Sequence, residues 1–239
     1  MSRIEVVHLT KRYGAVTAVD DLTFALDPGT ITGFVGANGA GKSTTLRMLL
    51  GLTRPTSGSA LIDGRPYADL REPARTVGAL TDLDVFHPGR SGRKALRVLA
   101  AASRIPEERV DELVEVVGLA DAAHRRVGGY STGMRQRLGL AAALLGDPSI
   151  LVLDEPANGL DPVGIHWLRG LLRQLAGEGR TLLVSSHQLA ELAQTVDDVL
   201  LIHAGRLVAR GSTADLMARH RAESLEELYL DIVTKGSSS

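Results

Sequence analysis

The chain contains no cysteine among its 239 residues. Disulfide bonds, thiol catalysis and cysteine-ligated zinc sites are therefore excluded, although this absence does not fix the compartment. Neither positive nor negative charge is in excess, because 27 basic residues are balanced by 28 acidic ones and the formal net charge is −1. Such a balance lacks the basic field that marks nucleic-acid binders, so we expect no nucleic-acid partner.

Long hydrophobic runs are also missing. The longest apolar stretch, residues 138–145, falls far short of the roughly 18 residues that a membrane span needs. The first five residues show no apolar signal region. We therefore expect a cytoplasmic protein whose only contact with the membrane is made through a partner.

Short apolar runs alternate with helical patterns along most of the chain. This alternation predicts an α/β fold with a mostly parallel sheet that is covered by helices. A turn is expected at 11–14, a hairpin at Ala204 and Gly205, and a short helix from His187. The expected strands are 4–9, 22–26, 31–35, 60–62, 76–80, 150–153, 181–185, 199–203 and 206–210. The longer expected helices are 42–50, 91–103, one opened by Pro106, 131–145, 161–175, 213–220 and 224–233.

The pattern changes from strands to helices after about residue 82 and returns to a strand at residue 150. We interpret 83–146 as a helical insertion that interrupts an α/β core. The core comprises 1–82, with an antiparallel β subdomain at its start, and 147–220. Residues 221–239 are expected to form a C-terminal helix and a flexible tail.

A glycine-rich turn joins the apolar run 31–35 to the helix that follows it. Its sequence, G-A-N-G-A-G-K-S at 36–43, fits the phosphate-loop pattern, although a glycine-rich turn can match by chance. Loop amides and the helix N-terminus would donate to phosphate oxygens. Lys42 would reach the β- and γ-phosphates, and the Ser43 hydroxyl would bind Mg²⁺. The residues expected to bind phosphate are Gly36, Ala37, Asn38, Gly39, Ala40, Gly41, Lys42, Ser43 and Thr44.

Two carboxylates, Asp154 and Glu155, end another apolar strand. In phosphate-loop ATPases a strand-end carboxylate completes the Mg²⁺ site, which suits Asp154. Glu155 is placed to activate an attacking water as general base. The alternative is an acidic pair that simply faces solvent. Because ligands bind at the carboxyl ends of parallel strands, we expect the phosphate loop, this pair and His187 to form one site.

A second anion-binding candidate is Y-S-T-G-M-R-Q-R at 130–137. Ser131 offers a hydroxyl at the start of a helix, and Gly133 lets a ligand approach the backbone. An ordinary capped helix would explain the same residues. Further on, Asp161 and Pro162 form a cap and first-turn pair that predicts another helix start.

With these motifs in this order, the chain resembles the ATP-binding cassette (ABC) ATPases, the nucleotide-binding subunits of transporters. The resemblance runs from about residue 3 to 211 and includes N-G-L-D at 158–161 and S-S-H at 185–187. It implies MgATP as the bound nucleotide, with Tyr13 stacking on adenine and His187 bonding the γ-phosphate. The same resemblance implies that Asp161 is one of the residues that bind the nucleotide. Tyr13 as a surface aromatic and His187 as a simple helix start are the alternatives.

The resemblance also implies that two copies pair head to tail as a homodimer. Each ATP would then lie between the phosphate loop of one subunit and the Ser131 loop of the other. Two departures from the family pattern matter. The usual signature L-S-G-G-Q is Y-S-T-G-M here, and the glutamine that usually follows the strand 76–80 is replaced by Asp82, or by Asp84 under another alignment.

Both departures resemble exporters of the ABC-2 type, the drug and antibiotic self-resistance group. The resemblance therefore implies an ATPase subunit that works with separate ABC-2-type transmembrane subunits. Because Mg²⁺ prefers hard oxygen ligands and tends to keep its waters, we expect Asp82 to act through a Mg²⁺-bound water, and the alternative is a solvated loop aspartate. A soluble ABC protein that acts on ribosomes or DNA is one alternative, although it would usually carry two cassettes or long coiled coils. An importer ATPase is another, although it would more often retain the glutamine.

Overall fold

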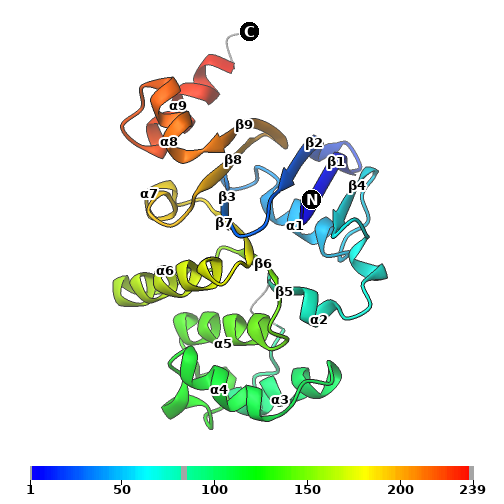
Figure 1. The fold of residues 1–239 in the computed structure, drawn as a ribbon, viewed down its shortest axis with the longest axis vertical. Coiled ribbons are helices and arrows are strands. Elements are labelled where there is room, and N and C mark those ends of the chain that lie inside the picture. Colours follow the sequence, from blue (N-terminus) through cyan, green and yellow to red (C-terminus); the bar gives the residue numbers. More distant parts are fainter. Residues whose placement is uncertain (1, 82–84, 237–239) are drawn as a thin grey trace. The chain divides into compact units, whose positions relative to one another are not determined.

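The computed structural model describes residues 2–81 and 85–236 (Figure 1). They fall into two compact units, of which the first runs up to Arg71 and resumes at Leu172, and the second is Glu72–Leu171. The helical segment expected at 83–146 lies within the second unit. Asp82 and Asp84, the two candidates for the glutamine position, lie outside the described residues.

The first unit contains a three-stranded antiparallel sheet in the order β2-β1-β4, which confirms the expected antiparallel subdomain. The turn expected at 11–14 is wrong, because Lys11 and Tyr13 belong to the strand and pair with Val19 and Val16. The chain reverses only at Gly14 and Ala15, where Gly14 has a φ of 58°. The strands of this sheet are β1 (Ile4–Tyr13), β2 (Val16–Leu26) and β4 (Ser57–Ile62).

The same unit holds four further strands that adjoin in the order β7-β3-β8-β9. The first three run parallel, and β9 returns antiparallel to β8 through the expected turn at Ala204 and Gly205. β3 is buried along its whole length, including the polar Thr32, as expected of a parallel strand that is covered on both faces. The strands are β3 (Ile31–Val35), β7 (Thr181–Ser186), β8 (Asp198–His203) and β9 (Arg206–Ser212).

Helices of the first unit follow three of these strands. The helix expected from His187 begins two residues later, because Gln188 has an extended backbone and stands before the first helical turn. The helices expected at 213–220 and 224–233 are present, the second extending further along the chain. The helices are α1 (Lys42–Leu49), α7 (Leu189–Ala193), α8 (Thr213–His220) and α9 (Leu225–Gly236), with a short 3-10 turn at Tyr67–Asp69.

The second unit combines one parallel strand pair with helices. Val77–Leu80 (β5) pairs in parallel with Ile150–Asp154 (β6). Pro106 does not open the helix itself, because helical geometry begins at Glu108 after the cap at Glu107. Leu96, Val110, Leu113, Val114 and Leu138 are among the side chains that form its core. The helices are α2 (Pro73–Thr76), α3 (Gly92–Ala102), α4 (Glu108–Val116), α5 (Thr132–Leu144) and the first part of α6 (Pro162–Gly177), with 3-10 turns at Ala120–Ala122 and Val127–Gly129.

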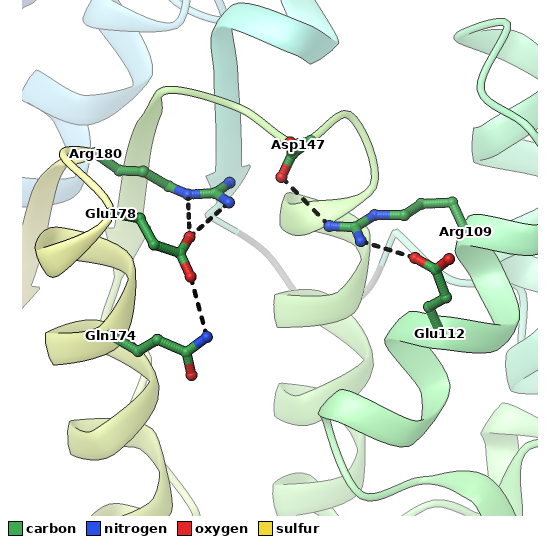
Figure 2. A network of polar contacts seen from close by, with 6 residues as sticks. All are labelled: Arg109, Glu112, Asp147, Gln174, Glu178 and Arg180. Carbon is green, nitrogen blue, oxygen red and sulfur yellow. Dashed lines mark hydrogen bonds and ion pairs between the residues drawn. The ribbon is translucent and has the colours of Figure 1, made fainter.

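Polar side chains brace the turns that lead into β6 and β7 (Figure 2). In the second unit, Arg109 on α4 donates to Glu112 at 2.9 Å and to Asp147 at 3.4 Å. In the first unit, the Glu178 carboxylate accepts from Gln174 at 3.0 Å and from Arg180 at 2.8 Å. Exposed pairs of this kind contribute up to about 1 kcal/mol each. These pairs hold the turns in front of β6 and β7. Asp154 is the last residue of β6, and His187 follows β7. 

Candidate functional site

The phosphate loop lies in the first unit, between β3 and α1, and its glycines are required by close backbone neighbours. A Cβ on Gly36 would lie 2.2 Å from the Ile202 carbonyl oxygen of β8. A Cβ on Gly41 would lie 2.4 Å from the Ala18 carbonyl oxygen of β2, and Gly41 also has a φ of 104°. The loop therefore passes between two strands with no room for side chains at these positions.

Lys42 supplies the cation of this loop. The residue is only 6% exposed, and its Nζ donates to the carbonyl oxygens of Gly36 at 2.7 Å and Ala37 at 3.3 Å. The ammonium group is thus held over the loop, next to the N-terminus of α1. A lysine, a helix N-terminus and exposed residues at 37–39 together form a site suited to phosphate oxygens. Ser43 is exposed at the first turn of α1, where its hydroxyl is available to a metal ion.

The structure brings His187 to the same edge of the sheet as the phosphate loop. Val35 and Ser186 are register partners in the parallel strands β3 and β7, so Gly36 and His187 leave the sheet at neighbouring strand ends. The His187 side chain is exposed. The Ser186 hydroxyl accepts from the Gln188 backbone N–H at 2.9 Å and thereby orders the turn. This part of the expected site is therefore assembled within one unit.

Tyr13 lies at the tip of the β1–β2 hairpin, and the residue is 51% exposed. Its cross-strand partner Val16 is 66% exposed, so the hairpin tip presents an apolar surface to solvent. Lys11 Nζ lies 4.9 Å from the centre of the Tyr13 ring. From Val16, β2 runs on to Ala18, which contacts the phosphate loop. An exposed tyrosine on the hairpin whose second strand contacts the loop fits a base-stacking role.

In the second unit, Asp154 ends β6 and Glu155 follows it with a φ of 51°. The Glu155 carbonyl oxygen accepts a hydrogen bond from Gln136 Nε2 at 3.0 Å. Gln136 is 2% exposed and lies on α5. Sequence reasoning missed this residue, because Gln136 lies between Arg135 and Arg137 and the local pattern does not mark it as buried. It ties the residue expected to act as general base to the helix that begins at Ser131.

Ser131 caps α5, as the sequence predicts, because its hydroxyl accepts from the Met134 N–H at 3.2 Å. A Cβ on Gly133 would lie 3.0 Å from the Gly159 carbonyl oxygen, so the signature segment packs on the 158–161 loop within this unit. Before it, the Tyr130 hydroxyl donates to the Ala122 carbonyl oxygen at 2.7 Å, and burial raises the pKa of that phenol. These contacts fix the exposed Ser131 at the start of its helix.

Asp161 also caps a helix, because Oδ1 accepts from the Gly164 N–H at 2.7 Å. The structure thus gives Asp161 a local role in starting α6. Among the described residues, no three histidine, aspartate or glutamate side chains gather as a ready-made metal site. A Mg²⁺ ion does not need such a cluster, because it usually keeps several waters and binds through one or two protein oxygens plus substrate phosphates.

Comparison with known proteins agrees with these features. A sequence profile of the family described as "ABC transporter" matches residues 19–158. The bacitracin transport ATP-binding protein BcrA of Bacillus licheniformis is 43% identical over 221 residues, which cover 91% of this chain and 72% of that protein. The lantibiotic transport ATP-binding protein SrtF of Streptococcus pyogenes is 33% identical over 226 residues, which cover 95% of each.

Solved structures agree with the sequence comparison. A structure described as the ATP binding subunit of an ABC transporter matches with a TM-score of 0.87 and 30% identity, covering 97% of this chain and 100% of that one. Within the described residues, no helix has the length and apolar character that a membrane crossing requires. The chain therefore belongs to the ABC transporter family and is one of its ATP-hydrolysing cassettes.

Proposed function

We propose that the chain is the ATPase subunit of an ABC-2-type exporter of the drug and antibiotic self-resistance kind. The observation that carries this proposal is the similarity, over nearly the whole chain, to proteins named for bacitracin and lantibiotic transport. The signature Y-S-T-G-M supports the same group. We place the protein on the cytoplasmic face of the membrane, bound to separate transmembrane subunits. The ribosomal, DNA-acting and importer alternatives are not favoured by these relatives.

We assign the nucleotide contacts to the residues that the site makes available. Lys42 and the loop amides hold the β- and γ-phosphates, and Tyr13 stacks on adenine. His187 hydrogen-bonds the γ-phosphate. Ser43 and Asp154 would hold Mg²⁺, which would neutralise phosphate charge. Asp82 remains our candidate for a water-mediated contact with this ion.

Hydrolysis then needs a water positioned in line with the γ-phosphorus. Glu155 accepts a proton from that water, and its backbone is held by Gln136. Catalysis rests mainly on positioning and on charge stabilisation by Lys42 and His187, because phosphoryl transfer requires little covalent chemistry from the protein. Closure of a homodimer around two ATP molecules, and its opening after hydrolysis, would drive the membrane subunits.

The dimer is tested by Ser131→Arg. Ser131 is exposed at the N-terminus of α5, where it can meet the γ-phosphate bound to a partner subunit. An arginine there would fill that space, so we expect the ATP-dependent dimer to be lost while nucleotide affinity of the single subunit stays within about twofold. Size-exclusion chromatography with MgATP, in a background that does not hydrolyse ATP, measures the dimer.

The matched control for this variant is Ser91→Arg. Ser91 caps α3 in the same unit, and its hydroxyl accepts from the Lys94 N–H at 3.4 Å. Both variants lose a helix cap of similar strength, typically about 1 kcal/mol. Only Ser131→Arg should block the dimer. A dimer that still forms with Ser131→Arg would contradict the head-to-tail arrangement.

The exporter assignment is tested by co-purification. The tagged chain, expressed in its native host, should be recovered from the detergent-solubilised membrane fraction together with a multi-span membrane protein in stoichiometric amounts. Cells carrying both should tolerate a peptide antibiotic better than cells carrying either alone. Recovery of the chain with ribosomes, and no change in tolerance, would contradict the proposal.

A further inference from the structure

The β8–β9 turn lies directly against the phosphate loop. The backbone N–H of Gly205 in this turn donates to the carbonyl oxygen of Ala40 at 3.0 Å. Near the end of β8, Ile202 occupies the space that a side chain at Gly36 would need. The phosphate loop is therefore supported near its start and near its end by the same short segment, residues 202–205.

One side of this turn is tied to β2. The Gly205 carbonyl oxygen accepts from the Asp20 backbone N–H at 2.9 Å. The Asp20 carboxylate accepts from Arg206 Nε at 2.8 Å and also pairs with the second guanidinium nitrogen at 2.6 Å. Both guanidinium nitrogens contact the same carboxylate oxygen, Oδ2, in a charge-assisted contact. Gly205 therefore bonds the phosphate loop through its N–H and β2 through its carbonyl oxygen, with an ion pair alongside.

The other side of the turn is tied to the C-terminal helix. The Tyr229 hydroxyl on α9 lies 3.1 Å from His203 Nδ1, at the end of β8. The two rings also meet edge to face, with 6.2 Å between their centres. Both side chains are half-buried. Helix α9 thus contacts the residue that is two positions before Gly205.

We infer that Asp20, Arg206 and Tyr229 are positioning residues for nucleotide binding, acting through the β8–β9 turn on the phosphate loop. None of them needs to touch the nucleotide. A loop held in its binding shape loses less conformational freedom when phosphate binds, so its affinity is higher. The inference rests on the proposed phosphate role of the loop, and it adds the C-terminal helix to the parts of the chain that set nucleotide affinity.

The test is a calorimetric titration of the purified chain with MgADP. We expect Arg206→Ala to weaken binding about threefold to fivefold, the size of one exposed charge pair. Tyr229→Phe, which removes one hydroxyl, should weaken it about threefold. The double variant should lose about tenfold, because the two attachments lie on different sides of the turn. Arg206→Lys keeps the charge and should restore part of the affinity.

Arg173→Ala is the matched control. Arg173 pairs with Asp197 at 2.7 Å. Asp197 directly precedes β8, so this pair lies at the opposite end of the strand from the turn. Both arginines are largely exposed, so both variants should lower the melting temperature by a similar small amount. Only the variants at the turn should change MgADP affinity. With ATP as substrate, they should raise KM and leave kcat within about twofold.

Wild-type MgADP affinity in the double variant would overturn the inference. An equal loss of affinity in Arg173→Ala would also overturn it, because it would reveal a general loss of stability. Failure of wild-type protein itself to bind MgADP is a separate result, which would contradict the proposed function of the loop.

Discussion

Glu155→Gln is expected to lower the ATPase rate at least about a hundredfold while leaving ATP affinity within about twofold of wild type. A positioned general base typically contributes 10²–10⁴-fold to a rate. The amide keeps the size of the carboxylate but cannot take the proton of the attacking water. Backbone strain should not change, because Glu and Gln have similar costs at the φ of 51° that this residue adopts.

The rate is measured as phosphate release at saturating MgATP, and affinity by titration with ATP. ATP should also accumulate in the closed dimer, visible by size-exclusion chromatography. Glu112→Gln serves as the matched control, because Glu112 lies in the same unit and pairs with Arg109 on the surface. Near-wild-type hydrolysis by Glu155→Gln would show that another group takes the proton.

Lys42→Ala is expected to weaken ATP binding itself by about tenfold to a hundredfold. Hydrogen bonds to charged groups contribute about 1.5–3 kcal/mol, and each 1.4 kcal/mol is tenfold in affinity. The Lys42 ammonium also bonds the carbonyl oxygens of Gly36 and Ala37. The variant therefore loses both the phosphate contact and a constraint on the loop.

A titration with a non-hydrolysable ATP analogue measures this loss without interference from turnover. Lys94→Ala removes an exposed lysine from the first turn of α3, which tests whether any loss of positive charge has the same effect. The contrast with Glu155→Gln is informative, because one variant should fail to bind and the other should bind but fail to hydrolyse. An unchanged affinity of Lys42→Ala for the ATP analogue would contradict the phosphate-loop assignment.

The sequence alone was sufficient where the governing interactions are local. The helix caps at Ser131 and Asp161 each join residues three positions apart, and the hairpin at Ala204 and Gly205 depends on two adjacent positive φ angles. The pattern of the phosphate loop is likewise contained in eight consecutive residues. Short-range chemistry of this kind is visible in a sequence because the interacting groups are chain neighbours.

Local cues failed where pairing with another strand decided the outcome. Lys11 and Tyr13 lie in a stretch that looks like a turn, yet pairing with β2 keeps them extended. The difference arises because strand propensity depends on the partner that a strand finds. The start of α7 was also misplaced, by two residues, which is within the usual uncertainty of helix ends.

The site stays a prediction made from a set of motifs, and tertiary structure decides what supports each of these motifs. Gly36 must be glycine because of Ile202, a residue far away in the sequence. Gln136 holds the backbone of Glu155, and Gly205 bonds Ala40. The sequence by itself determined which residues we expect to carry the chemistry, because motif spacing is a property of the chain. Only the fold decided which residues support them, because support requires backbones from distant segments to pack within van der Waals distance.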